Sequence, residues 1–302
     1  MSKAFGYRAY GGPENQEFLD RPVPDPGPGQ LLIAVRAAGV NPVDWKIRNG
    51  WLGTSAPLPR VLGVEAAGVV QRVGAGVTGF VPGDEVFGVA AAGGYAEHTL
   101  LDADATARRP AGVSFARAAA LPVAAATAYD AVEQLALEPG RTLLVLGVGG
   151  GVGSAAAQIA VARGVRVVGT AADRSRAYVE ELGAVQVRYG EGVADRIRAA
   201  APDGVDGLLD LIGGEDLREA AAVLADRTRL VSTADPETAA ALGGSAVRRS
   251  SGPAALDGVA ELVATGALDP RVTATYPLER AAEALAEVES GHARGKLVLV
   301  ME

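Results

Sequence analysis

The stretch RTLLVLGVGGGVGSAAAQIAVARGVRVVGTAADR, residues 141–174, decides the fold of this 302-residue chain. It begins with a short apolar run at 143–146, which predicts a buried strand. Five glycines follow within seven positions, and an alanine-rich segment at 154–163 then predicts a helix that Gly164 terminates. A second apolar run at 165–168 completes a strand–helix–strand unit.

The glycines between the first strand and the helix follow a GxxGxxG spacing over Gly147, Gly150 and Gly153, with Gly151 and Val152 between the last two. Glycine allows the backbone to bend sharply and to approach a pyrophosphate closely, and a helix N-terminus offers unpaired N–H groups to phosphates. The turn therefore predicts a dinucleotide site with Gly150, Gly151 and Val152 as contacts. The alternative is a glycine-rich turn with a purely structural role.

The end of the second strand bears on which dinucleotide binds. An acidic residue about 20 residues beyond the glycines favours NAD, whereas a nearby arginine accommodates the 2′-phosphate of NADP. Residues 170–172 carry no carboxylate, and Arg174 and Arg176 follow, although Asp173 lies beside them. This pattern favours NADPH, with Thr170 and Arg174 as contacts. The alternative is that either arginine is a solvated charge in the next helix.

Composition limits the class of protein. The chain is 49% hydrophobic and 21% charged, which is typical of a globular protein with a sizeable core. Its net charge of −8 argues against a nucleic-acid partner. The chain has no Cys and only two His, so a disulfide, a thiolate nucleophile and most catalytic metal sites are not expected. Because no apolar run has the length of a signal peptide or a membrane span, we expect a cytoplasmic protein without a membrane partner.

The first third of the chain predicts a β domain. Prolines are concentrated in residues 13–59, where they favour short strands joined by ordered loops. Strands are expected at 31–37, 64–73 and 84–89, with glycine turns between the later ones. Short strands at this close spacing indicate a small, barrel-like domain.

From about residue 122 the pattern changes to alternating helices and strands. Helices are expected at 122–135, 176–182 and 193–200, and strands at 185–189, 208–212 and 230–232. This alternation predicts a doubly wound parallel sheet. A helix at 278–290 and a strand at 296–300 then return to the first domain. The predicted domains are therefore 1–121 with 268–302, and 122–267.

Several short motifs occur in a fixed order along almost the whole chain. They are AGVNPVD (38–44), LGVEAAG (62–68), GDEV (83–86), GGYAE (93–97), LP (121–122) with TAY (127–129), the glycine turn, and GKLV (295–298). In this order they resemble the zinc-independent quinone oxidoreductase (zeta-crystallin-like) branch of the medium-chain dehydrogenase/reductases. The resemblance implies a GroES-like catalytic domain wrapped around a Rossmann domain, with the active site in the cleft between them. It also implies NADPH-dependent reduction of quinones or α,β-unsaturated carbonyls without zinc, and a homodimer.

The resemblance adds further cofactor contacts. Thr127 matches the position that touches the nicotinamide carboxamide, although a helical threonine also bonds back to its own turn. Tyr189 matches a tyrosine after the third strand, one residue early, and Ile212 ends the following strand. Lys296 either reaches the cofactor from the closing strand or points to solvent. Ala172 lacks the hydroxyl that the family often has in the 2′-phosphate pocket.

Asn41 and Lys46 are the candidate catalytic residues. Addition of hydride to a conjugated carbonyl compound develops negative charge on the oxygen, which a fixed hydrogen-bond donor or cation stabilises. Asn41 followed by Pro42 also predicts the start of a helix, with Asp44 in its first turn. Lys46 either polarises the carbonyl or faces solvent. Glu65 matches an acidic position of the family, and we expect it to be structural.

Other functions remain open from the sequence. The closest is an enoyl-thioester reductase or a polyketide-tailoring reductase, which would use the same cofactor site. A different class is a non-catalytic NADPH-binding protein of crystallin-like or partner-binding type. Trp45 and Trp51 either form the walls of a site for a flat substrate or pack into the core.

Overall fold

The computed structural model describes residues 1–250, 252–291, 293 and 295–301, and it contains two compact units. The first unit comprises Met1–Val123, Ser251–Ala264 and Pro270–Glu302. The second unit comprises Ala124–Ser250 and Thr265–Asp269. The C-terminal segment belongs to the first unit, as the sequence predicts, because its last strand pairs with a strand of that unit.

The first unit is built on a strand that pairs with three others. β3 hydrogen-bonds to β5, β7 and β15, and β6 pairs with both β5 and β7, so that β3, β5, β6 and β7 close on themselves. This closed arrangement confirms the barrel-like domain expected from the sequence. A small sheet of order β2-β1-β4 lies beside it. The strands are β1 (Ser2–Tyr7), β2 (Gln16–Arg21), β3 (Gln30–Val40), β4 (Arg60–Val61), β5 (Glu65–Val73), β6 (Glu85–Ala90), β7 (His98–Arg108), β14 (Val272–Pro277) and β15 (Lys296–Val300).

Few helices belong to the first unit. They are η1 (Pro13–Asn15), α1 (Pro42–Arg48), α2 (Phe115–Ala119), α9 (Ala254–Ala264), η5 (Leu278–Arg280) and α10 (Ala281–Glu289). Helix α9 contacts β7, so it lies in this unit, whereas the sequence analysis placed it in the nucleotide-binding domain. The amphipathic pattern of a helix shows that one of its faces is buried, but not which sheet covers that face. The sequence therefore could not predict the unit to which α9 belongs.

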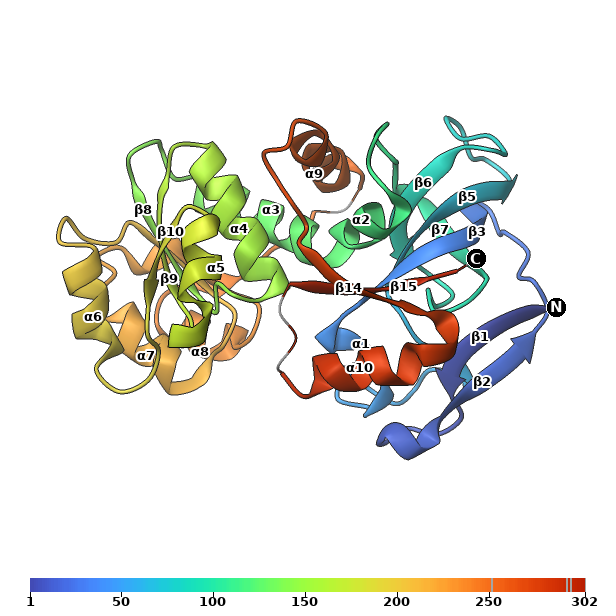
Figure 1. Cartoon of the computed structure of the whole chain (residues 1–302), viewed down its shortest axis with the longest axis horizontal. Helices are drawn as coiled ribbons and strands as arrows, with labels where there is room; N and C mark the ends of the chain where they lie inside the picture. The colour runs from blue at the N-terminus through green and yellow to red at the C-terminus, as the bar shows by residue number, and fades with distance from the viewer. Residues whose placement is uncertain (251, 292, 294, 302) are drawn as a thin grey trace. The chain divides into compact units, whose positions relative to one another are not determined.

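The second unit is a parallel sheet of six strands in the order β10-β9-β8-β11-β12-β13 (Figure 1). All its pairs are parallel, and helices cover both sides of it, which confirms the doubly wound sheet. The order reverses at β8, whose C-terminal end carries the glycine turn. The strands are β8 (Thr142–Leu146), β9 (Arg166–Thr170), β10 (Ala184–Val187), β11 (Gly207–Asp210), β12 (Leu230–Ser232) and β13 (Ser245–Ala246).

The helices and strands of the second unit begin and end close to their expected positions, with three differences. A π-helical turn (Leu121–Ala125) precedes α3 (Ala126–Leu135), where one continuous helix was expected. Helix α4 (Gly151–Ala162) begins three residues early because two of the glycines form its first turn. β10 and β11 end before Tyr189 and Ile212, so both residues lie in the loops beyond the strands. The remaining helices are η3 (Asp173–Ser175), α5 (Arg176–Glu181), α6 (Val193–Ala200), α7 (Gly214–Ala221), η4 (Arg227–Arg229) and α8 (Pro236–Ala241).

Candidate functional site

The glycine turn opens α4 as the sequence predicts. Gly147 has φ 82°, in the left-handed region that favours glycine, and Gly150 is the N-cap of the helix. The N–H groups of Gly151 and Val152 therefore lie in the first turn, where a helix has no acceptors of its own for them. Such a turn at the end of a central parallel strand is a site for phosphate groups.

Gly153 allows the strand and the helix to approach each other closely. A Cβ at this position would lie 2.4 Å from the carbonyl oxygen of Gly147 and 2.7 Å from Cα of Val148. At Gly149, by contrast, a Cβ would meet nothing within 4 Å. The turn thus contains one glycine required for packing and one that is not.

Two side chains hold this turn and the loop beside it. Thr170 is buried at the end of β9, and its hydroxyl accepts a hydrogen bond of 3.0 Å from the N–H of Gly147. Ile212 is 55% exposed and lies over Gly147. Its loop is turned by Asp210, which accepts hydrogen bonds from the N–H groups of Ile212 and Gly213 at 3.0 and 2.8 Å. Asp210 was not among the predicted site residues, although a carboxylate at the carboxyl end of a parallel strand is a recognisable signal.

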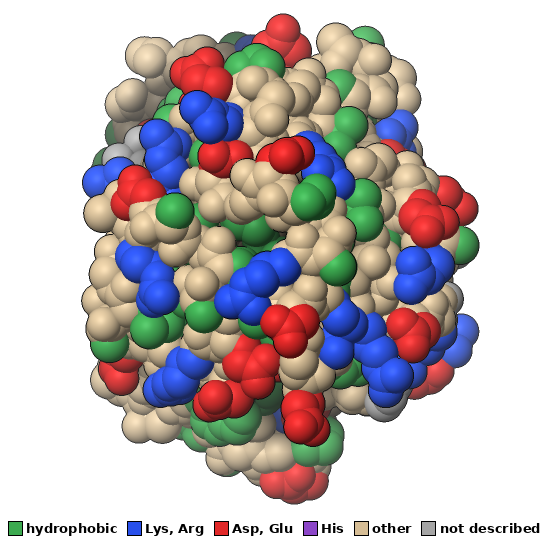
Figure 2. All heavy atoms as spheres, turned by 90° about the vertical axis from the view of Figure 1, so that its left-hand side faces the viewer, with side chains coloured by type: hydrophobic (Ala, Val, Ile, Leu, Met, Phe, Trp, Pro, Cys, Tyr) green, Lys and Arg blue, Asp and Glu red, His purple; other side chains and the backbone are tan. Residues whose placement is uncertain are grey.

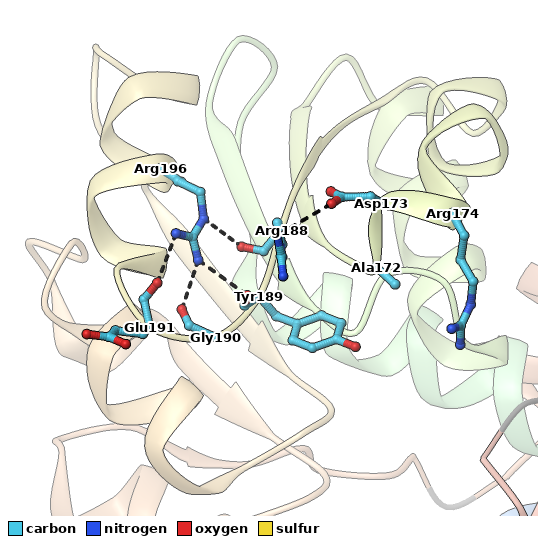
Figure 3. Close-up of a pocket in the computed structure, with 8 residues that line it drawn as sticks. All are labelled: Ala172, Asp173, Arg174, Arg188, Tyr189, Gly190, Glu191 and Arg196. Carbon is cyan, nitrogen blue, oxygen red and sulfur yellow. Dashed lines mark hydrogen bonds and ion pairs between the residues drawn. The ribbon is translucent and has the colours of Figure 1, made fainter.

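A pocket of about 640 Å³ lies beyond the ends of β9 and β10 (Figure 3). It brings together Arg174 and Tyr189, which were predicted as cofactor contacts, and Arg188, which was not. Figure 3 shows the Tyr189 ring between the segment 190–191 and Ala172, with Arg174 on the other side of Ala172. Among the described residues, no carboxylate forms an ion pair with Arg174, whereas Arg176 lies 3.9 Å from Glu180 in a solvated pair. Arg174 and not Arg176 therefore has the properties of an anion ligand.

Arg196 shapes the wall of this pocket. Its guanidinium donates to the carbonyl oxygens of Arg188, Tyr189, Gly190 and Glu191 at 2.9 to 3.3 Å. These bonds fix the loop that carries Tyr189 and Arg188, as the dashed lines in Figure 3 show. Arg188 also lies 3.8 Å from Asp173, so this acidic residue of the pocket already faces a cation.

Thr127 contacts Arg249, which was not among the predicted site residues. It is buried on α3, and its hydroxyl accepts a hydrogen bond from Arg249. Asp130, one turn later, accepts from Nε of Arg249 at 3.0 Å. This arrangement places a guanidinium beside the threonine expected at the nicotinamide.

The first unit contains the other candidate residues. Asn41 is the N-cap of α1, as predicted, and Asp44 in the first turn accepts a hydrogen bond of 2.8 Å from its N–H. The Asn41 side chain is 3% exposed, and both ends of its amide have partners. Its nitrogen donates to Glu65 at 2.7 Å, and its oxygen accepts from Lys296 at 2.6 Å.

Lys296, Glu65 and Asn41 form one buried network. The Lys296 ammonium lies 2.8 Å from Glu65, and the exposed fractions of the two side chains are 4% and 0%. Lys296 therefore does not point to solvent. The other oxygen of Glu65 accepts from the N–H of Val123 at 2.7 Å, so Glu65 also holds the π-helical turn. The structural role expected for Glu65 agrees with these contacts, but its partners lie far away in the sequence and were not foreseen.

Asp44 is buried next to this network. Burial raises its pKa from the ordinary value of 3.8 to about 7, while hydrogen bonds from Tyr95 and from the Asn41 backbone partly offset the rise. The Tyr95 hydroxyl donates to Asp44 at 2.7 Å. Asp44 is therefore protonated in the folded protein at pH values where it is ionised in the unfolded chain.

We expect stability to fall as pH rises between about 4 and about 7 because of Asp44. In this window the unfolded chain has released the Asp44 proton and the folded protein still binds it, so raising the pH favours unfolding. Both tryptophans, Trp45 and Trp51, lie in the first unit, so urea unfolding followed by tryptophan fluorescence reports on this unit. The nearly isosteric Asp44→Asn should show a flatter profile than the wild type; identical profiles would contradict the assignment.

Lys46 is the more accessible catalytic candidate. It is half-buried on α1, and its ammonium lies 5.8 Å from the ring centroid of Trp45. Trp45 packs against the core of the first unit, and Trp51, whose ring lies 5.0 Å from it, is 66% exposed. One tryptophan thus packs into the core and the other remains accessible.

Metal ligands do not gather in the described part of the chain. No group of three or more His, Cys, Asp or Glu side chains there has a geometry that could hold a metal ion. The chain also has no Cys, so a zinc site with thiolate ligands cannot form in it. Among the same residues, no helix is long and apolar enough to cross a bilayer.

The comparisons with known proteins agree with this geometry. The family model for the alcohol dehydrogenase GroES-like domain matches residues 27–111, and that for zinc-binding dehydrogenase matches residues 182–299. The quinone oxidoreductase of Sus scrofa is 32% identical over 97% of this chain and 95% of its own length. This chain belongs to the quinone oxidoreductase family of the medium-chain dehydrogenase/reductases. It is thus an enzyme of an oxidoreductase family, as the sequence predicts.

Other known proteins are also similar to this chain over most of its length. The chloroplastic NADPH-dependent alkenal/one oxidoreductase of Arabidopsis thaliana is 33% identical over 98% of this chain and 79% of its own length. The structure of the quinone oxidoreductase from Coxiella burnetii superposes with a TM-score of 0.90 at 30% identity, covering 100% of this chain and 99% of that one. A mycobacterial protein in complex with NADPH superposes with a TM-score of 0.89 at 29% identity, with full coverage of both chains.

Proposed function

We propose that this chain reduces a quinone or an α,β-unsaturated carbonyl compound with NADPH. The observation that carries the proposal is the basic pocket beyond β9 and β10, next to a glycine turn that opens a helix. Relatives named as quinone oxidoreductases and as an NADPH-dependent alkenal/one oxidoreductase support the reaction class.

The residues present fit NADPH. The N–H groups of Gly151 and Val152 would bind the pyrophosphate, with Gly150 lying close beside it. The N–H of Gly150 donates to the carbonyl oxygen of Gly147, and Thr170 holds the turn in place. Arg174, Arg188 and Tyr189 would bind the 2′-phosphate, Ile212 would pack against the adenosine half, and Thr127 would bind the carboxamide.

The choice of NADPH over NADH rests on charge. An NAD-specific site has an acidic residue at the end of the second strand for the ribose hydroxyls. Here Thr170 is followed by two alanines, and the nearby Asp173 faces Arg188. Two arginines therefore dominate the charge where the 2′-phosphate would bind.

The chain itself would contribute positioning and charge to the reaction. Bound NADPH supplies the hydride to the electron-poor carbon and water supplies the proton, so the products are NADP⁺ and the hydroquinone or saturated carbonyl compound. The Lys46 ammonium would stabilise the negative charge that develops on the substrate oxygen. Because the amide of Asn41 already has partners at both ends, we assign it the role of fixing the start of α1, and Lys296 the role of orienting Asn41.

Oxidation of NADPH with 1,4-benzoquinone or a simple enone as acceptor tests the proposed function. Lys46→Ala should lower kcat about tenfold or more while changing the Kd for NADPH little, because the ammonium acts on the substrate oxygen. Arg36→Ala, on a strand of the same unit, provides a control at an exposed cation. Binding of NADPH without turnover of any acceptor in a broad quinone, enone and enoyl-thioester panel would favour the non-catalytic alternative.

Arg174→Ala should raise the KM for NADPH about tenfold and leave the KM for NADH unchanged, because only NADPH has a phosphate for the guanidinium to bind. Arg176→Ala is the matched control, since Arg176 pairs with Glu180 on the surface. Steady-state kinetics with both cofactors provide the measurement. An equal effect on NADPH and NADH would remove Arg174 from the 2′-phosphate site.

A further inference from the structure

Asp210, the last residue of β11, connects two loops at the carboxyl end of the parallel sheet. Its side chain is fully buried, and its Oδ1 accepts hydrogen bonds from the N–H groups of Ile212 and Gly213 at 3.0 and 2.8 Å. Its Oδ2 accepts from the hydroxyl of Ser232 at 2.6 Å. Ser232 is the last residue of the neighbouring strand β12 and is also fully buried. One carboxylate therefore bonds to the loop after β11 and to the end of β12.

The Ser232 hydroxyl extends this connection into the loop after β12. Its oxygen accepts from the N–H groups of Ala234 and Asp235 at 3.1 and 2.9 Å. The Asp235 carboxylate in turn accepts from the N–H of Gly214 at 3.2 Å, where the loop after β11 enters α7. Gly213 allows the two loops to approach, because a Cβ at this position would lie 2.7 Å from Cβ of Asp235. Two side-chain bridges thus hold the two loops together.

Ile212 is the residue that these bonds hold in place. Its N–H is fixed by the buried carboxylate of Asp210, whereas its side chain is 55% exposed. A Cβ at Gly147 would lie 2.8 Å from Cδ1 of Ile212, so this side chain lies against the first residue of the glycine turn. The hydroxyl of Thr170 holds the N–H of the same glycine. An apolar side chain with a fixed backbone is therefore available to a molecule bound at the turn.

We propose that Asp210 is a positioning residue for the cofactor, which holds the Ile212 side chain over the glycine turn as a surface for the adenosine half. A loop that is fixed before binding does not have to be ordered when the ligand arrives, and the conformational entropy that is saved appears as affinity. Asp210 acts only through Ile212, because the buried carboxylate itself has no exposed surface. NADPH and NADH share the adenosine half apart from the 2′-phosphate, so both should be affected alike. The inference rests on the proposed cofactor site.

A double-mutant cycle for cofactor binding tests this role. Asp210→Ala and Ile212→Ala should each raise the Kd for NADPH and for NADH about fivefold, as measured by fluorescence titration. The double variant should bind no more weakly than the weaker of the two single variants, because Asp210 acts through Ile212. Asp210→Asn should stay close to the wild type, since its amide oxygen can still accept from the same two N–H groups. Effects that multiply in the double variant, or an Asp210→Asn that binds as weakly as Asp210→Ala, would overturn the inference.

Ser232→Ala keeps the experiment decisive if Asp210→Ala does not fold. It removes the bridge between the loops but leaves the Asp210 carboxylate in place, and it enters the same cycle with Ile212→Ala. Thr228→Val is the matched control, because the Thr228 hydroxyl also donates to a carboxylate, that of Asp226, at 2.6 Å, but in the exposed turn η4. This control should leave both Kd values unchanged. An equal rise in Thr228→Val and Ser232→Ala would contradict a specific role of the bridge.

Kinetics with 1,4-benzoquinone separate positioning from a general loss of structure. In Asp210→Ala the KM for NADPH should rise by a larger factor than kcat falls, because other residues act on the substrate once the cofactor is bound. A lower unfolding midpoint with wild-type Kd values would show that Asp210 serves folding alone, against the inference. If the wild-type protein binds neither cofactor, the proposed function is wrong as well. If it binds both and Ile212→Ala binds them equally well, only the inference about Asp210 fails.

Discussion

Replacing Lys296 with methionine will destabilise the first unit by about 3–5 kcal/mol, the cost typical of breaking a buried ion pair by removing one partner. The ammonium of Lys296 is the only cation within bonding distance of Glu65 among the described residues, and both side chains are buried. Without this ammonium, the buried carboxylate of Glu65 has no positive charge to balance it. The side-chain oxygen of Asn41 also loses its hydrogen-bond donor. Urea unfolding followed by tryptophan fluorescence will measure the loss.

Two comparisons make the result specific. Glu65→Gln combined with Lys296→Met should recover part of the loss, because it removes the uncompensated charge. Lys3→Met breaks a surface pair with Glu279, which lies at the same distance of 2.8 Å, and should change the midpoint little. An equally small change for Lys296→Met would mean that the buried pair does not stabilise the fold.

Gly153→Ala will weaken binding of both NADPH and NADH by more than about tenfold, a cost above about 1.4 kcal/mol. The added Cβ would lie 2.4 Å from a backbone oxygen, so α4 must move away from the strand that precedes it. This movement displaces the helix N-terminus that would bind the pyrophosphate. Fluorescence titration with each cofactor will measure the effect.

Substitutions at two neighbouring glycines distinguish an effect on packing from an effect on cofactor contact. Gly149→Ala should change binding little, because its Cβ would meet nothing within 4 Å. Gly150→Ala should leave the unfolding midpoint unchanged, since its Cβ would come only to 3.6 Å of Gly147, yet weaken both cofactors by filling the space of the phosphate. Equal affinities in Gly150→Ala and the wild type would place the pyrophosphate elsewhere.

These variants also distinguish the cofactor site from the specificity pocket. Substitutions at the glycine turn should affect NADPH and NADH alike, whereas Arg174→Ala should affect NADPH alone. Figure 2 shows that positive and negative side chains are interspersed on the face it presents. Discrimination of a 2′-phosphate would therefore depend on local contacts such as those proposed for Arg174 and Arg188, and not on a broad positive field.

The parallel sheet and the turn that opens α4 follow from local patterns. The closing strand was predicted at 296–300 and is observed as β15 (Lys296–Val300), because consecutive apolar residues there have no other stable environment. The helix start at Asn41 also follows from its neighbours along the chain. The ends of β10 and β11 were predicted too far along, since apolar residues such as Ile212 continue beyond the last ladder hydrogen bond.

The sequence by itself determined the fold class, the glycine turn and the family, because each depends on residues that are close together in the chain. Only the tertiary structure decided the partners of the charged and polar side chains. Lys296 meets Glu65 across 231 positions, and Gln134 meets Arg248 across 114. An apolar residue needs only a core, and its pattern reveals that need; a buried charge or amide needs a particular partner, which only folding brings within hydrogen-bond distance.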